Sequence, residues 1–250
     1  MSKEPTAMEA LLDEGMARHQ AGDLAQARDR YRTVLSSNPS EPTALNMLGL
    51  VEAQTGDLDC ALRFFSRAVE AAPDYPDALM NLARALRQKD RHAEAIPHLQ
   101  AFLVLDADSV VAGMELGEAH LRNNAPEEAR RHYEWVLQRA PDTIEAKRGL
   151  AQALAEMREN EAALELFEEI LVALPDEPSS HANCGNVLRN LERLEEAAVR
   201  YRAALALDPG FANGHSNLAA LQLWQGENNA ALASAEAALR FDPSLHQAQS

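Results

Sequence analysis

The sequence predicts an all-α protein, an α-solenoid of antiparallel helical hairpins, and three observations carry this prediction. The 250 residues repeat with a period of thirty-four, and the register holds across seven units without insertion or deletion. Each unit contains two short segments whose apolar residues recur at helical spacing. Small residues also recur at one fixed place in each segment. The period is marked by Pro39, Pro73, Pro141, Pro175, Pro209 and Pro243, with Ala107 at the remaining proline place.

The unit 42–75 shows why each repeat should form a hairpin. Its two apolar segments are too short to be stable alone, so they must pack against each other and against neighbouring units. Between them, Gly56 is free to take the left-handed conformation that ends a helix, and Asp57 can cap the amides that open the next one. Proline suits the first helical position, where no amide donor is needed, and it stands there at Pro42, Pro76 and Pro178.

Small residues stand where the two helices of a hairpin must approach each other. In the first helices they are Gly15, Gly49, Ala83, Gly117, Ala151, Gly185 and Ala219, and in the second helices Ala27, Ala61, Ala95, Ala129, Ala163, Ala197 and Ala231. Four residues after each of these alanines comes a larger side chain that we expect to fill the space between neighbouring hairpins. These side chains are Tyr31, Phe65, Leu99, Tyr133, Phe167 and Tyr201, and the seventh copy has Ala235.

The small, aromatic and proline places resemble the pattern of the tetratricopeptide repeat (TPR) family over residues 8–245. The resemblance implies a right-handed superhelix whose first helices line a concave face, and it implies protein recognition more than chemistry. Polar residues depart from the family pattern at Arg18, Glu52, His120 and Gln222, where the family usually has a large apolar or aromatic residue. Pro97 falls inside a second helix, which we expect it to kink.

Taken in order, the chain divides into a leader, an array and a short tail. Residues 1–7 form the polar leader, and residues 246–250 begin a truncated cap or an eighth repeat. We expect this tail to be poorly ordered or covered by a neighbouring molecule. An apolar ridge of Leu221, Leu223 and Trp224 on the last first helix supports that view, because solenoids usually end in a helix with a polar outer face. The seven repeats are 8–41, 42–75, 76–109, 110–143, 144–177, 178–211 and 212–245.

Composition narrows the possible partners. A net charge of −16 and a pI near 4.9 argue against nucleic acid and anionic membranes, which need a basic surface. The start of the chain lacks an apolar run of signal-peptide length, and no eighteen apolar residues follow one another, so we expect a cytoplasmic protein. Cys60 and Cys184 lie more than three repeats apart and are expected to be packing residues rather than a disulfide.

The sequence contains no recognisable catalytic, cofactor-binding or metal-binding motif. Its eight histidines include no HExxH run and have no carboxylate beside them at metal-ligand spacing. Phosphate-binding loops and nucleophile elbows are also missing. His181 and His215 share one repeat place, which favours a structural role. We therefore predict a protein without enzymatic activity.

The candidate binding surface is the face of the first helices that should line the concave groove. In the first four repeats its places hold apolar residues, and in the last three they hold polar ones, so we expect a divided peptide groove. Flexible methionines would accept apolar side chains, and asparagine amides would grip an extended backbone. The predicted groove residues are Met16, Met47, Leu50, Met80, Asn81, Arg84, Arg87, Met114, Arg148, Asn183, Asn186 and Asn217, flanked by Leu12, Leu121, Gln152, Arg189 and Ser216.

A structural explanation of the polar residues stays open beside this one. Asparagine is common at its place in the family, and the arginines could pair with Glu115, Glu118 or Glu145 on neighbouring helices. For the whole chain the leading hypothesis is a module that binds a protein or peptide. The first alternative is a substrate-recruiting arm, because residues 19–39 together with residues 44–57 resemble the amino-terminal arm of bacterial multidomain glycosyltransferases, sulfotransferases or methyltransferases. The second alternative is a scaffold that self-associates through its end repeats.

Overall fold

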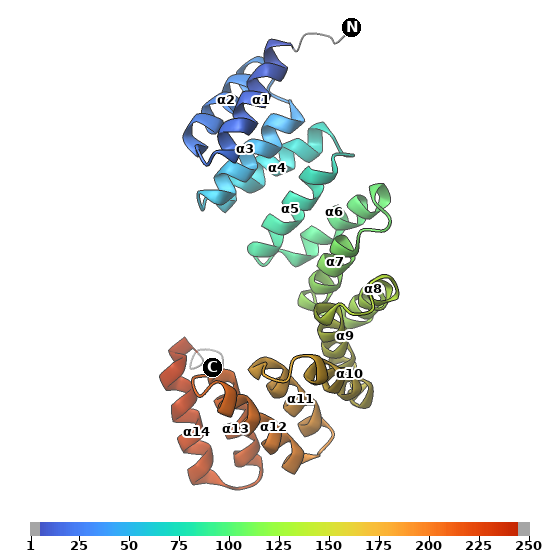
Figure 1. Ribbon diagram of the computed structural model, residues 1–250, viewed down its shortest axis with the longest axis vertical. Helices are drawn as coiled ribbons and strands as arrows, with labels where there is room; N and C mark the ends of the chain where they lie inside the picture. The colour runs from blue at the N-terminus through green and yellow to red at the C-terminus, as the bar shows by residue number, and fades with distance from the viewer. Residues whose placement is uncertain (1–5, 245–250) are drawn as a thin grey trace. The chain divides into compact units, whose positions relative to one another are not determined.

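The computed structural model describes residues 6–244, which form fourteen helices and no strand (Figure 1). The chain divides into two compact units, with the border between Ala125 and Pro126. This border lies inside the predicted fourth repeat, between its two helices. Each unit is a stack of antiparallel helices in which consecutive helices pack against each other, and this confirms the predicted α-solenoid.

Helix starts recur at the predicted period. The first unit contains α1 (Ala7–Gln20), α2 (Leu24–Ser37), α3 (Pro42–Gln54), α4 (Leu58–Ala71), α5 (Pro76–Gln88), α6 (His92–Leu105) and α7 (Val110–Arg122). The second unit contains α8 (Pro126–Arg139), α9 (Ile144–Glu156), α10 (Asn160–Ala173), α11 (Pro178–Asn190), α12 (Leu194–Leu207), α13 (Ala212–Trp224) and α14 (Asn228–Phe241). From α2 onward, corresponding helices begin thirty-four residues apart.

Each hairpin turn contains one residue in the left-handed conformation. Glycine takes this place in three turns, with φ of 78° at Gly22, 88° at Gly56 and 78° at Gly226. Asp57 then accepts a hydrogen bond from the Cys60 amide at 2.9 Å, as the capping prediction requires. The other four turns place a residue with a side chain in the same conformation, namely Asp90, Asn124, Arg158 and Glu192, with φ between 55° and 63°.

Three aromatic rings lie directly against a glycine of their own hairpin. A Cβ atom added to Gly15 would lie 2.6 Å from the Tyr31 ring, and one added to Gly185 would lie 2.5 Å from the Tyr201 ring. Phe65 lies against Gly49 in the same way. The rings also belong to core clusters with residues of the next hairpin, Tyr31 with Leu48 and Phe65 with Leu82, as expected of side chains between neighbouring hairpins. Tyr133 alone of the four reaches a glycine of the next hairpin, Gly149 on α9.

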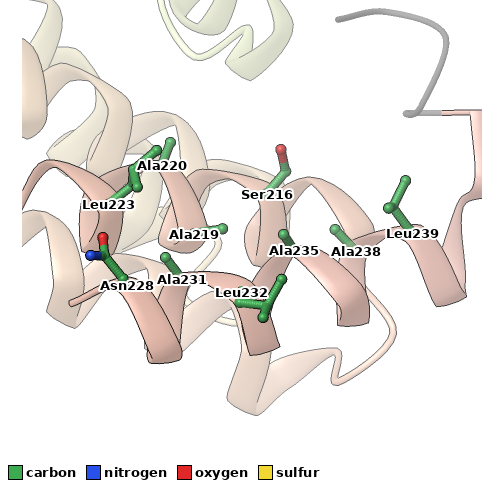
Figure 2. Close-up of a pocket in the computed structure, with 10 residues that line it drawn as sticks. All are labelled: Ser216, Ala219, Ala220, Leu223, Asn228, Ala231, Leu232, Ala235, Ala238 and Leu239. Atoms are coloured by element: carbon green, nitrogen blue, oxygen red, sulfur yellow. The ribbon is translucent and has the colours of Figure 1, made fainter. Parts of the chain in front are cut away.

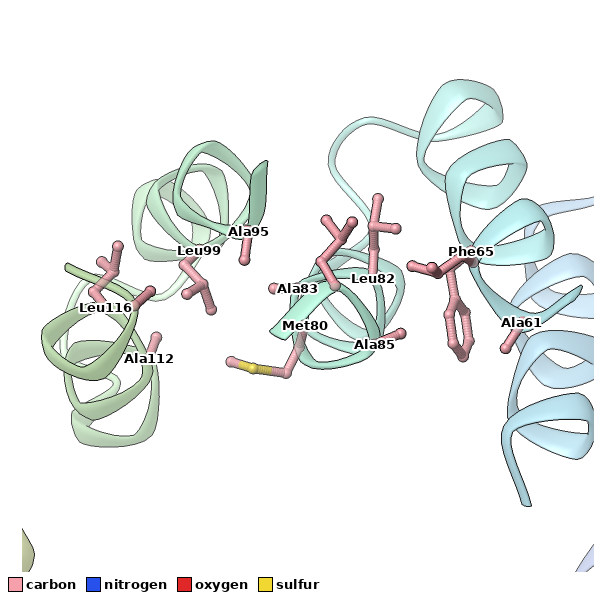
Figure 3. Packing of buried hydrophobic residues seen from close by; sticks show 13 residues of the cluster. Ala61, Phe65, Met80, Leu82, Ala83, Ala85, Ala95, Leu99, Ala112 and Leu116 are labelled. Carbon is pink, nitrogen blue, oxygen red and sulfur yellow. The ribbon is translucent and has the colours of Figure 1, made fainter. Parts of the chain in front are cut away.

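The core of the first unit continues from α4 to α7 through small and branched side chains. Figure 3 shows Phe65 on α4 facing α5, and Leu99 and Leu116 meeting beyond it. Met80 points from α5 towards α7 and is 8% exposed. The helix α6 is continuous from His92 to Leu105 with Pro97 inside it.

Two of the polar residues at apolar family places form hydrogen bonds with a neighbouring helix. Glu52 on α3 is buried and accepts two hydrogen bonds from Arg28 on α2. Gln222 on α13 is buried and accepts a hydrogen bond from Ser234 at 2.8 Å. His120 is buried on α7, whereas Arg18 is exposed on α1.

Both cysteines are free. Cys184 is fully buried, and burial raises the pKa of its thiol, whereas Cys60 is half-buried.

The last helices depart from the predicted apolar ridge. Leu221 is fully buried, so it belongs to the core and not to the ridge, whereas Leu223 and Trp224 are exposed. For Leu223 the reason is helical geometry, since a residue two places after Leu221 points to another side of the helix. The predicted state of residues 246–250 lies outside the described residues.

Candidate functional site

The predicted apolar lining of the first unit is mostly half-buried. Met16 and Met47 pack with one flank against the core around Tyr31, and Leu50 packs against the neighbouring core cluster. Met114 on α7 is also half-buried. Leu12, Met80 and Leu121 are buried, at 8–9% exposure. The accessible apolar surface therefore comes from Met16, Met47, Leu50 and Met114.

The structure brings Arg84 and Arg87 of α5 together with two glutamates of α7. Arg84 Nε lies 3.1 Å from Glu115 Oε1, and Arg87 pairs with both Glu115 and Glu118. The Arg87 side chain is only 15% exposed and that of Glu115 16%. The charges of this cluster are thus largely compensated within the unit. Together with Gln88, Asp90, His92 and Arg122, the four residues line a hollow of about 440 Å³.

Asn81 is engaged in an internal chain of hydrogen bonds. Its amide donates to Asn46 Oδ1 at 3.0 Å, and Asn46 in turn donates to the Tyr75 hydroxyl at 3.4 Å. Asn46 is fully buried. Desolvation is the main reason why the pKa of Tyr75 is raised, and the hydrogen bond from Asn46 opposes that shift. Asn81 therefore connects α5 to α3 within the first unit.

Two of the predicted polar residues in the second unit are also used internally. Arg148 on α9 donates to both carboxylate oxygens of Glu177, at 2.9 and 2.8 Å. Asn186 on α11 accepts a hydrogen bond from the Tyr201 hydroxyl at 2.9 Å. These contacts fit the structural explanation of the polar residues that the sequence left open.

Asn183 and Asn217 differ from the other predicted asparagines. They stand thirty-four residues apart, on α11 and α13, and both are half-buried. Within residues 6–244, neither side chain makes an intramolecular hydrogen bond. The first helices α11 and α13 pack directly against each other. Nearby, Gln152 donates to Glu156 at 3.1 Å, Arg189 is half-buried, and Ser216 lies near the end of the unit.

An apolar groove lies between α13 and α14, which the sequence did not reveal as a cavity (Figure 2). Its volume is about 570 Å³. A signal existed in the sequence, because Ala235 stands where six earlier repeats have a larger side chain. The lining residues are Ser216, Ala219, Ala220, Leu223, Asn228, Ala231, Leu232, Ala235, Ala238 and Leu239.

The histidines at one repeat place have the same structural role. His181 Nε2 lies 2.8 Å from the Pro175 carbonyl, and His215 Nε2 lies 2.9 Å from the Pro209 carbonyl. Each ring thus holds the turn that precedes its own helix. Among the described residues, no three His, Cys, Asp or Glu side chains are grouped so that they could hold a metal ion. In the same part of the chain, every helix is too short or too polar to cross a membrane.

Known structures share this fold. A tetratricopeptide repeat protein from Parabacteroides merdae ATCC 43184 is 15% identical with a TM-score of 0.74, and the match covers 95% of this chain and 94% of the other. MamA from Desulfovibrio magneticus RS-1 is 17% identical with a TM-score of 0.60, and the match covers 68% of this chain and 96% of the other. A chain of the APC/C hetero-tetramer Cut9–Hcn1 is 16% identical with a TM-score of 0.64, and the match covers 92% of this chain and 45% of the other.

Sequence comparison gives the family directly. No curated protein sequence matches the chain significantly. A family model described as "Tetratricopeptide repeat" matches residues 12–76 and 114–178, and a second model with the same description matches residues 52–114. A model described as "TPR repeat" matches residues 185–226. The chain therefore belongs to the tetratricopeptide repeat family, as its repeated small, aromatic and proline places predict.

Proposed function

We propose that this protein is a non-enzymatic module that binds an extended peptide or protein segment on the exposed faces of its first helices. TPR proteins generally act as protein-interaction scaffolds, and the chain has the repeats of that family. The observation that carries the proposal is the pair Asn183 and Asn217. They occupy one repeat place on adjacent first helices, and within residues 6–244 no internal hydrogen bond uses their amides.

An unused asparagine amide suits an extended backbone. The amide offers one acceptor and two donor hydrogens, so it can pair with both the N–H and the C=O group of a peptide. Asn81 and Asn186 have the same chemistry, but their partners are Asn46 and Tyr201. A half-buried amide whose donors and acceptor lack partners costs free energy, and a ligand that forms hydrogen bonds with it removes that cost. Asn183 and Asn217 are thus the better candidates for backbone recognition.

In the first unit the accessible methionines are the better candidates for side-chain recognition. Methionine is flexible and polarisable, so Met16, Met47 and Met114 can adapt to different apolar side chains. Burying one such side chain contributes about 1.5–3 kcal/mol, whereas an exposed ion pair contributes at most about 1 kcal/mol. Arg84 and Arg87 already pair with glutamates, so we assign them a structural role. The strongest binding contribution should therefore come from apolar contacts.

The experiment starts from a random peptide library displayed on phage, selected on the immobilised full chain. A selected peptide is then labelled, and its dissociation constant is measured by fluorescence anisotropy. Asn183→Ala and Asn217→Ala together should weaken binding about tenfold, because two hydrogen bonds of about 0.5–1.5 kcal/mol each are lost. Gln138→Ala, an exposed amide on the second helix α8, is the matched control and should leave the constant unchanged.

Equal binding by the double variant and the control would show that the first-helix face of the second unit is not the binding surface. Circular dichroism of each variant establishes that the helices are intact. The predicted connection to a transferase remains a prediction, since the comparisons match the repeats alone.

A further inference from the structure

We propose that the groove between α13 and α14 is a homodimer interface, in which α14 of one copy packs antiparallel against α14 of a second copy. The proposal goes beyond the peptide-binding function, because it rests on Leu232, Ala235 and Leu239 of the second helix α14 and not on the asparagines and methionines of the first helices.

Two leucines that line the groove are much more exposed than the leucines at the same places of an earlier repeat. Leu232 is 61% exposed, whereas Leu164, at the same place two repeats earlier, is 6% exposed. Leu239 is 40% exposed, whereas Leu171 at its place is 7% exposed. In α10 these leucines are covered by the next hairpin. The last hairpin presents the same apolar surface to solvent, and such a surface is a site of association.

The hollow itself comes from one substitution in the repeat pattern. Ala235 occupies the place of Phe167 and Tyr201, whose rings are buried in the two preceding hairpins. Without a ring at this place, the space beside Ala219, Ala231 and Ala235 stays empty (Figure 2). A large apolar side chain from outside could fill it.

The spacing of large and small residues on α14 is self-complementary. Leu232 stands three residues before Ala235, and Ala238 stands three residues after it. Likewise, Ala231 stands four residues before Ala235, and Leu239 stands four residues after it. If two copies of α14 cross antiparallel at Ala235, each leucine therefore lies opposite an alanine of the other copy. A two-fold axis makes one patch sufficient for both sides of such a contact.

Charge favours a second copy on this face. The chain has a net charge of −16, so two copies repel each other over most of their surfaces. Among the fourteen residues of α14, only Glu236 and Arg240 are charged, and their charges cancel. The helix α14 can therefore approach α14 of a second copy without net charge repulsion.

A head-to-tail contact with the first hairpin is less favourable. On the outer face of α1, Glu14 stands where later first helices have Leu48, Leu82, Leu116, Leu150 or Leu218. Glu14 is paired with Arg30 at 2.9 Å and with Arg18 at 3.9 Å. Stacking α1 onto the apolar groove would bury this ion pair, and the cost of desolvation opposes it.

The first test measures the mass of the full chain in solution by light scattering across a dilution series. We expect twice the monomer mass of 27.4 kDa at high concentration and dissociation on dilution. Leu232→Asp should weaken the dimer at least about a hundredfold, since each dimer buries the changed residue twice. Val199→Asp is the matched control, because Val199 is 62% exposed on α12 outside the groove, and it should leave the mass unchanged.

The second test determines whether the two copies of α14 cross at residue 235. In a Cys60→Ser background, Ala235→Cys should form a reducible covalent dimer under mild oxidation, because the two copies of residue 235 meet at the crossing. Val199→Cys should not. A wild-type chain that stays at 27.4 kDa at about 100 µM, far above the Kd of a stable dimer, overturns the proposal. A dimer that resists Leu232→Asp, or that does not cross-link through residue 235, also overturns it.

Discussion

Arg28 binds the buried carboxylate of Glu52 with two hydrogen bonds, from Nε at 2.9 Å and from Nη2 at 3.0 Å. The bond pair joins α2 of the first hairpin to α3 of the second. The Glu52 side chain is 8% exposed and that of Arg28 26%, so the pair is shielded from solvent. A bidentate pair with this geometry holds the two helices in one register as well as contributing energy.

Removing Arg28 should destabilise the first unit, because Glu52 would remain as a buried charge without its main partner. For Arg28→Met we expect a loss of about 2–3 kcal/mol in the free energy of unfolding, measured by urea denaturation. The double variant Arg28→Met with Glu52→Leu should recover most of this loss, since apolar residues of similar size can replace a buried ion pair. A double variant as unstable as the single one would show that packing at Arg28, and not the charge of Glu52, is decisive.

Glu192→Gly should stabilise the second unit. Glu192 has φ of 60°, and this left-handed conformation is costly for a residue with a side chain and easy for glycine. We expect a gain of about 0.5–1 kcal/mol, read from the shift of the urea midpoint. Glu195→Gly, three residues later and inside α12, is the control, and it should destabilise by about 1 kcal/mol. If both substitutions destabilise, the turn at Glu192 does not carry the expected strain.

Stability should fall between pH 10 and pH 12 because of Tyr201. Burial raises the pKa of this tyrosine from 10.0 to about 12, so the unfolded chain loses the phenolic proton first as the pH rises. The folded state then binds more protons than the unfolded state, and the free energy of unfolding decreases by about 1 kcal/mol by pH 11. Urea midpoints at pH 9 and pH 11 measure the change. Tyr201→Phe should show a smaller decrease, and an identical decrease in both proteins would assign the effect to other groups.

The methionines of the first unit should separate into two classes. Met80 lies in the core, so Met80→Ser should cost about 2–4 kcal/mol of stability, as large-to-small core substitutions do. Met47 and Met114 are half-buried, and their change to serine together should leave the urea midpoint nearly unchanged while weakening a phage-selected peptide tenfold or more. Unchanged peptide affinity in this folded double variant would remove the methionines from the binding face.

The sequence by itself determined the period, the helices and their caps. The starts of α3 and α5 at Pro42 and Pro76, the left-handed turn at Gly56 and the cap at Asp57 follow from local backbone chemistry. Such features depend on residues a few places apart, and the thirty-four-residue repeat brings several of them back in more than one unit. Family membership follows from the same places.

Only the tertiary structure decided which side chains meet. It assigned Arg84 and Arg87 to Glu115 and Glu118 and left the Asn183 amide unused. Likewise, it buried Leu221 while exposing the groove beside Ala235. These partners belong to different helices, so their contacts depend on the distances and rotations at which the helices pack. A repeat pattern prescribes similar packing everywhere, whereas the differences between repeats determine where a surface remains open for a partner.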